Sequence, residues 1–109
     1  MQNRKAPAFQ EYAAEILADH RYRLMTFAER GLLFSMRLEC WVNRKIPSNA
    51  GELAKILGFD ASEVGAALSE RVKSFFVEDK GFFTCIELDY YRAHLDERKA
   101  KQSEKKKKG

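Results

Sequence analysis

Apolar residues recur with a helical period along most of this chain. The first such stretch spans residues 9–24, where Phe9, Tyr12 and Ile16 are spaced to share one face of a short helix. The beginning of this stretch is also compatible with an extended segment. Residues 1–8, which precede it, show no periodic pattern and predict a flexible arm.

A longer helix is predicted from Thr26 to about Asn43. Thr26 and Glu29 have the spacing of a capping box, in which each side chain accepts a hydrogen bond from the backbone N–H of the other residue. The apolar positions that follow form a stripe broad enough for a helix packed on two sides: Leu33, Phe34, Met36, Leu38, Cys40 and Trp41. The dipeptide Ile46-Pro47 breaks the pattern.

Two further helices are predicted, separated by a tight turn. Ser48 or Asn49 can cap the first, and Gly58 fits its end because glycine readily adopts the left-handed conformation found there. Asp60 can cap the second, which is expected over residues 61–74. The buried edge of this second helix is marked by Val64, Leu68, Val72 and Phe75. Such a helix-turn-helix spacing leaves one helix face free to enter a DNA major groove, which is about 12 Å wide.

The period changes after residue 74. Residues 75–78 and 82–86 are rich in aromatic and β-branched residues, and they flank the turn-forming sequence Asp79-Lys80-Gly81. This pattern predicts a two-stranded hairpin. Phe82 and Phe83 cannot both face inward on one strand, so one of them is expected to be exposed or to lie in a dimer contact.

A last helix is predicted to begin near Tyr90 and to lose its apolar stripe after Leu95. Residues 96–109 are charged and low in complexity, so a basic, frayed or disordered tail is expected there. The order of elements predicts a mainly α protein with a small β-hairpin, a winged helix-turn-helix domain over residues 9–95. The simpler alternative is a helical pair that only packs a core.

The positions expected to contact duplex DNA lie on the second helix of the motif, at the hairpin turn, and just before the motif begins. They are Ser62, Ser69, Arg71, Lys73, Lys80, Arg44 and Lys45. A second candidate basic area comprises Arg4, Lys5, Arg21 and Arg23. The charge of the predicted recognition helix, residues 61–74, disfavours DNA binding. It has only two cations, and its acidic residues Glu63 and Glu70 repel phosphate.

The net charge of +4 resides in the tail. Residues 92–109 contain eight lysines and arginines against three acids, which leaves the first 91 residues with one net negative charge. A basic tail can add sequence-independent phosphate affinity, and it can equally be a solubilising end. The near-neutral folded part motivates a second hypothesis, in which the domain binds protein rather than DNA.

The sequence lacks the spacing of a catalytic or metal site. His20 and His94 have no partner at metal-ligand spacing, and no phosphate-binding glycine loop is present. Cys40 and Cys85 fall in apolar runs and are expected to be buried thiols, with a nucleophilic Cys40–His pair as the less favoured alternative. We therefore expect no enzyme activity, no cofactor and no metal.

Composition also bounds the location of the chain. An apolar fraction of 45% in 109 residues allows one globular core. No apolar run approaches the roughly 20 residues of a membrane helix, and no secretory signal follows the basic start. We expect a protein that lies in the cytoplasm, away from the membrane.

Several short segments carry a resemblance to a known family. They are Phe9-x-x-Tyr12, Ile16-Leu17-Ala18-Asp19, Leu24-Met25-Thr26-x-x-Glu29-Arg30-Gly31, the helix ending in Trp41, Ile46-Pro47 before Leu53-Ala54-x-x-Leu57-Gly58, Gly81-Phe82-Phe83, and Arg92 with Arg98. Over roughly residues 8–100 the chain resembles a small domain of unknown function found in prophages and at the N-terminus of phage replication-initiation proteins. Glu15 departs from the family, which usually has an aspartate there.

The resemblance implies a winged-helix domain of a mobile element that starts DNA replication, by binding origin sites or by recruiting a helicase or its loader. It supplies no catalytic residues. Many members continue beyond the basic helix, so this chain fits an excised N-terminal domain. Repeated or inverted sites would favour a homodimer, with the first helix or the hairpin edge as its interface. A phage transcriptional regulator would use the same DNA chemistry.

Overall fold

The computed structural model describes residues 8–108, with side chains for residues 8–98. The helices are α1 (Ala13–Ala18), α2 (His20–Arg23), α3 (Phe27–Asn43), α4 (Ala50–Leu57), α5 (Ala61–Ala67), α6 (Glu70–Lys73) and α7 (Ile86–Lys108). The strands are β1 (Ile46–Pro47), β2 (Val77–Asp79) and β3 (Phe82–Thr84). The described chain is mainly helical with a small antiparallel sheet. Apart from Ala8, the predicted arm over residues 1–8 lies outside the described residues.

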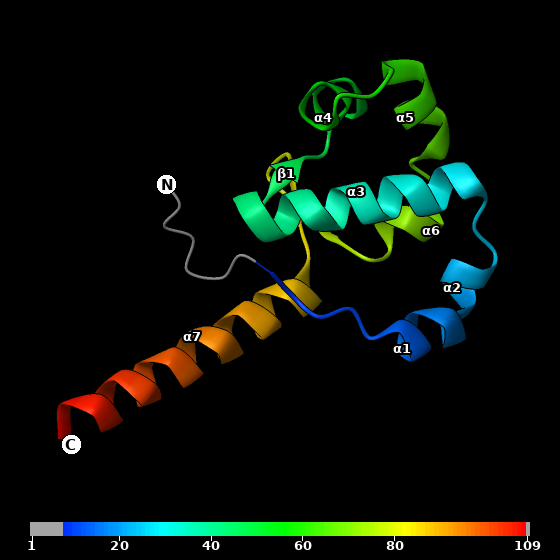
Figure 1. Ribbon diagram of the computed structural model, residues 1–109. Helices are drawn as coiled ribbons and strands as arrows, with labels where there is room; N and C mark the ends of the chain where they lie inside the picture. The colour runs from blue at the N-terminus through cyan, green and yellow to red at the C-terminus, as the bar shows by residue number, and fades with distance from the viewer. Residues whose placement is uncertain (1–7, 109) are drawn as a thin grey trace.

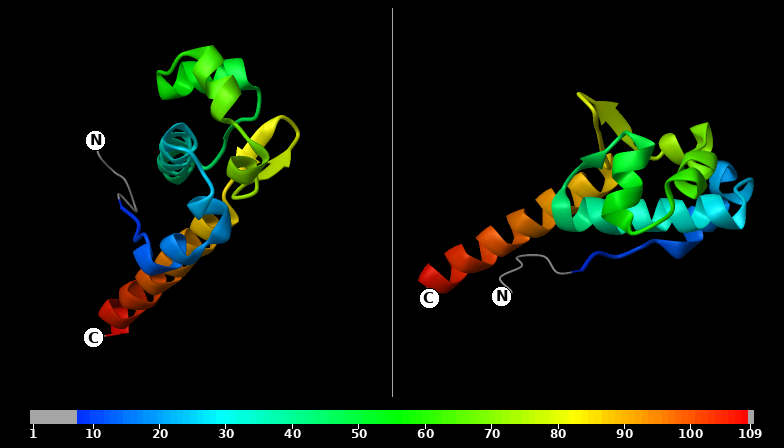
Figure 2. Two further views of the ribbon diagram at one scale, coloured as in Figure 1. Left: turned by 90° about the vertical axis from the view of Figure 1, so that its right-hand side faces the viewer. Right: turned by 90° about the horizontal axis from the view of Figure 1, so that it is seen from above.

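Helix α3 runs through the middle of the molecule (Figure 1). The helices α4 and α5 lie on one side of it, and α1, α2 and the start of α7 lie on the opposite side (Figure 2). Its inward residues Leu33, Met36 and Cys40 are at most 2% exposed. Full burial of a large aliphatic side chain contributes about 2 kcal/mol, so α3 supplies much of the core.

The sheet has the strand order β1-β3-β2, and both pairings are antiparallel. Ile46 of β1 pairs with Phe83 of β3, and both side chains are buried in the core. Phe82 lies on the other face of the sheet and is partly exposed, which confirms that only one of the two phenylalanines points inward. Strand β1 was not predicted, because a pairing across more than thirty residues leaves no signal in a dipeptide that contains proline.

The hairpin turn has the predicted position. Asp79 pairs with Phe82, so Lys80 and Gly81 form a two-residue loop. Their φ angles are 52° and 84°, and a type I′ turn requires positive φ at both central residues. This turn matches the right-handed twist of the strands and fixes the register of the hairpin.

The predicted helix caps are confirmed. Thr26 and Glu29 form a complete capping box at the start of α3. The Asn49 side chain caps α4, and the Asp60 side chain accepts hydrogen bonds from the first turn of α5. Gly58 ends α4 with a φ of 76° in the left-handed region, so the turn between α4 and α5 depends on a residue without a Cβ.

The prediction of one helix over residues 61–74 is wrong, because these residues form two helices. Helix α5 ends at Ala67, and Leu68 has a ψ of 68°, outside the helical region. Ser69 then caps α6, since its hydroxyl accepts a hydrogen bond from the backbone N–H of Val72. The same hydroxyl donates to the Glu29 carboxylate of α3. Serine competes in this way with a continuous helix, and a partner 40 residues away holds it in place.

The last helix is longer than predicted. Its apolar stripe is lost after Leu95 as expected, yet α7 continues to Lys108. The segment has no glycine or proline before Gly109, and lysine and glutamate, which favour helices, make up most of the part after Leu95. The sequence analysis did not take this local helix preference of residues 96–108 into account. Helix α7 therefore projects away from the body of the molecule (Figure 1).

The turn glycine gives a stability prediction. Gly58→Ala should lower the free energy of unfolding by about 1 kcal/mol, because a Cβ disfavours the left-handed conformation of this residue. Gly65→Ala in the middle of α5 is the matched control. No atom lies within 4 Å of a Cβ added there, so this change should stabilise by up to about 1 kcal/mol. Urea denaturation followed by circular dichroism measures both, and equal effects of the two changes would contradict the assignment of the turn.

The link between α3 and α6 predicts a dependence on pH. The hydrogen bond from Ser69, followed by that from the Thr26 backbone, lowers the pKa of Glu29 below its ordinary value of 4.5. A carboxyl with a depressed pKa stabilises the fold fully above its unfolded pKa, and this contribution is lost as pH falls through the folded pKa. Glu29→Gln should therefore make the unfolding free energy less sensitive to pH below 4.5. Urea midpoints at several acidic pH values test this, and an unchanged sensitivity would argue against the bond to Ser69.

Candidate nucleic-acid interface

The seven residues expected to contact DNA do not form one cluster. Ser69 bonds to Glu29 in the first turn of α3, and Arg71 and Lys73 follow on α6. Arg44 is the residue that ends α3 at its other extremity. Fifteen residues of α-helix separate Glu29 from Arg44, which corresponds to about 22 Å at a rise of roughly 1.5 Å per residue. The predicted site is thus divided between the two ends of α3.

The α6 group is poorly suited to reading DNA. The Ser69 hydroxyl is engaged with Glu29, and the side chain is half-buried. Lys73 forms an ion pair with Glu70 at 3.7 Å. Arg71 is exposed, and its charge contributes to the lowered pKa of Glu29. One cation of this group is therefore left without an ion pair among the described residues.

Helix α5, which should present the reading face, carries no lysine or arginine. Its exposed polar positions include Ser62 and Glu63. The Ser62 hydroxyl donates a hydrogen bond to the capping carboxylate of Asp60, so it is already occupied. Two carboxylates at the start of this short helix would repel a phosphate backbone.

The cations at the far end of α3 are more accessible. Arg44, Lys45 and Lys80 are exposed, and none of them forms an ion pair with a described carboxylate. The Lys45 ammonium lies 4.2 Å from the centre of the Phe82 ring, a cation–π geometry. Lys80 occupies the hairpin turn next to the same strand. Strand β3 thus places the ring of Phe82 against Lys45, with Lys80 in the adjoining turn.

Helix α7 starts beside this end of α3. The buried Arg92 guanidinium donates to the backbone carbonyls of Cys40 and Trp41 and lies 4.4 Å from the Trp41 ring centre. Arg92 therefore fixes the direction of α7 and is not a free basic residue, although the sequence placed it in the basic helix. The lysine-rich sequence from Lys99 to Lys108 lies further along the same helix. Arg44 and Lys45 thus lie at the end of α3 that contacts α7, while the lysine-rich sequence lies further out, because α7 projects away from the body of the molecule.

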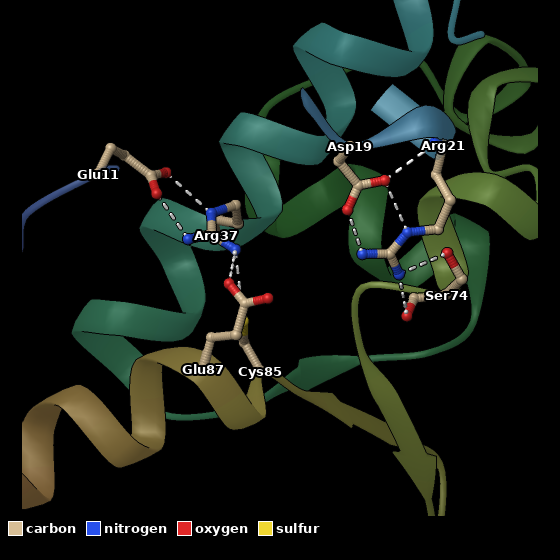
Figure 3. Close-up of polar contacts among 7 residues, drawn as sticks. All are labelled: Glu11, Asp19, Arg21, Arg37, Ser74, Cys85 and Glu87. Atoms are coloured by element: carbon tan, nitrogen blue, oxygen red, sulfur yellow. Dashed lines mark hydrogen bonds and ion pairs between the residues drawn. The ribbon is translucent and has the colours of Figure 1, made fainter. Parts of the chain in front are cut away.

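Two arginines, Arg37 and Arg21, form ion pairs that the sequence analysis did not predict (Figure 3). Arg37 of α3 is buried, and its guanidinium bonds to both carboxylate oxygens of Glu11, at 2.9 and 2.7 Å, and to Glu87 at 3.4 Å. A usable signal existed, because Arg37 lies four residues from both Leu33 and Trp41 on the buried face of α3. A charge at such a position requires an acidic partner.

Arg21 was expected in a second basic area, and the structure contradicts this. Its guanidinium makes two hydrogen bonds to Asp19, at 3.0 and 2.6 Å, and donates to the backbone and side-chain oxygens of Ser74 (Figure 3). It also lies 3.7 Å from the centre of the Phe75 ring. This residue joins α2 to the end of α6, and its hydrogen bonds lower the pKa of Asp19. Arg4 and Lys5 of the same area lie outside the described residues.

The described residues offer little for other chemistry. No group of three histidine, cysteine or acidic residues within them could hold a metal ion. Within residues 8–108, no helix is long and apolar enough to cross a membrane. The thiols of Cys40 and Cys85 are both buried and free, as predicted.

Comparisons with protein-family models, with curated proteins and with solved structures found no match to this chain.

The buried thiols give a chemical prediction. Burial raises the pKa of Cys40 to about 12 and raises that of Cys85 as well. The thiolate is the reactive form, so the folded protein should resist iodoacetamide at mildly alkaline pH. Mass spectrometry should show both cysteines alkylated in urea and neither in buffer. Rapid labelling of Cys40 in the native state would mean that the core around α3 opens easily.

Proposed function

We propose that this chain is a winged-helix domain that binds duplex DNA through its phosphate backbone. The order of the elements supports the fold: α3, β1, the pair α4–α5 joined at Gly58, and then a hairpin whose β3 pairs with β1. This is the plan of a helix-turn-helix followed by a wing. Helix α5 would occupy the place of the recognition helix, and Lys80 the tip of the wing.

The observation that carries the DNA proposal is the distribution of charge. Residues 8–98 contain twelve lysines and arginines against fifteen acids, so the body of the domain is acidic overall. The accessible cations Arg44, Lys45 and Lys80 nevertheless gather near the end from which α7 and its lysine run extend. Phosphate contacts give affinity without reading sequence, whereas a base-reading helix needs suitable side chains facing the groove. Helix α5 has no cation for this task.

The biological setting of the proposal comes from the family resemblance. It suggests a replication initiator of a phage or mobile element in a bacterial cytoplasm, acting without catalysis, metal or cofactor. Binding to origin sites would then depend on a bend or groove shape, or on the rest of a longer protein, more than on α5. A phage transcriptional regulator would bind through the same surface.

A protein-interaction module is the second candidate function. The same resemblance suggests recruitment of a replicative helicase or its loader. The observation that favours a protein contact is an uncharged, exposed face on α3, where Phe27 is 93% exposed. Contiguous apolar surface of this kind marks interaction sites more often than nucleic-acid sites.

Salt dependence of DNA binding tests the proposal. Each lost phosphate contact should lower the slope of log K against log salt concentration by about 0.9. We expect Arg44→Gln with Lys45→Gln to reduce the slope by almost two such steps on random duplex DNA. The matched control is Arg71→Gln with Lys73→Gln, which removes the same charge from α6 and should leave the slope nearly unchanged. Fluorescence anisotropy of a labelled duplex measures both.

Three outcomes would count against this proposal. A wild-type chain that does not bind duplex DNA at low salt would remove it altogether. A larger reduction of the salt slope in the Arg71 and Lys73 variant than in the Arg44 and Lys45 variant would indicate that the interface lies on residues 61–74. Strong preference for one sequence over random duplex would show that bases are read directly.

A further inference from the structure

One side of α3 has no charged residue along its whole length. With about 100° between successive residues, seven positions fall within an arc of roughly 120°. They are Phe27, Ala28, Gly31, Phe34, Ser35, Leu38 and Val42, and we call them the outer face of α3. Phe27 is 93% exposed, Val42 66% and Leu38 56%. A surface helix ordinarily carries polar and charged residues on its solvent side, so this face is unusual.

The described elements cover only part of the outer face: Tyr22 of α2 lies against Phe34 with the ring centres 6.4 Å apart, and Phe34 is 37% exposed. When α3 is viewed along its axis, the sheet lies on one side of it, with α4 and α5 above and α1 and α2 below (left view of Figure 2). A shallow, largely apolar groove runs beside the face, between α3 and α5. It is lined by Gly31 and Ser35 of α3 and by Phe59, Val64 and Ala67, with the Glu63 carboxylate as its one charged group. The face therefore combines projecting side chains with an adjacent apolar hollow.

The order of large and small residues on this face is self-complementary. If two copies of α3 cross antiparallel with residues 34 and 35 at the two-fold axis, Leu38 of each copy lies opposite Gly31 of the other. In the same register Phe27 lies opposite Val42. Leu38 thus meets the small Gly31 on both sides of the axis, and the apolar side chains of Phe27 and Val42 meet at both ends of the contact, as a two-fold arrangement requires. Because the face is uncharged, two positively charged chains meet there without local repulsion.

The exposed area is of the size that a dimer needs. A large aromatic or aliphatic side chain offers roughly 150–200 Å², so the exposed fractions of Phe27, Phe34, Leu38 and Val42 amount to roughly 450 Å² per copy. A standard interface buries about 800 Å² per partner, of which somewhat more than half is apolar. The four side chains alone supply that apolar share.

We propose that the outer face of α3 is the interface of a homodimer, in which two copies of α3 pack antiparallel about a two-fold axis near Ser35. The occupant of the face is a second copy of this chain. Each Leu38 side chain enters the groove beside Gly31 of the other copy. The inference does not rest on DNA binding, because it concerns the free protein.

Self-association of the full chain tests this inference without any DNA. Sedimentation equilibrium at micromolar concentrations should give a dimer for the wild type. Phe27→Glu should weaken the dimer by roughly 30-fold or more, the effect of losing one hot-spot side chain. Glutamate is favourable in the first turn of a helix, so the fold itself should be unaffected. Tyr90→Glu is the matched control, since Tyr90 is a 75% exposed aromatic residue on α7, and this variant should remain dimeric.

Gly31→Gln provides an independent variant. No atom lies within 4 Å of a Cβ added at Gly31, and glutamine favours helices, so the isolated chain should be as stable as the wild type or more so. The added side chain would fill the space that Leu38 of the second copy needs, and the variant should be monomeric. A wild type that is monomeric at all concentrations would overturn the inference, even if the outer face then proved to bind a different protein. A dimer that persists in both Phe27→Glu and Gly31→Gln would overturn it equally.

Discussion

The carboxylate of Glu29 is the point on which much of this fold depends. One oxygen accepts the backbone N–H of Thr26 at 2.9 Å and closes the capping box of α3. The other oxygen accepts the hydroxyl of Ser69, which in turn caps α6. A single acidic side chain thus starts one helix and holds the start of another. Its burial is tolerated because both oxygens have donors.

This contact has consequences for the surface of the molecule. Because Ser69 is held by α3, the chain cannot continue as one helix from Asp60 to Ser74. The cations that follow Ser69 are placed at the N-terminal end of α3, about 22 Å from Arg44 by helical rise. What is left on α5 is a short, mildly acidic helix. The hydrogen bond between Ser69 and Glu29 thus positions the cations of α6, whereas Arg44 and Lys80 are placed by the end of α3 and by the hairpin turn.

Features set by neighbours in sequence could be predicted, and features set by distant partners could not. The capping box at Thr26, the left-handed Gly58 and the turn at Lys80 each depend on residues within four positions, and all three are present. Strand β1, the break at Ser69 and the buried Arg37 depend on partners 26 to 50 residues away. Sequence periodicity indicates which positions face the core. It does not indicate which charged residues will form ion pairs with one another. For this reason the sequence could not indicate that the candidate DNA residues would be dispersed over the fold.

The width of the apolar stripe on α3 connects the sequence to the proposed assembly. The sequence predicts a helix packed on two sides, because its apolar stripe is broad. In the described chain α3 is covered on its inward side, where Leu33 and Met36 are buried, while Phe27, Leu38 and Val42 remain in solvent. Each exposed side chain of this kind forgoes about 25 cal/mol for every Å² that it could bury. An apolar helix face that stays in solvent favours a second packing surface, and a copy of the same helix offers one of matching shape.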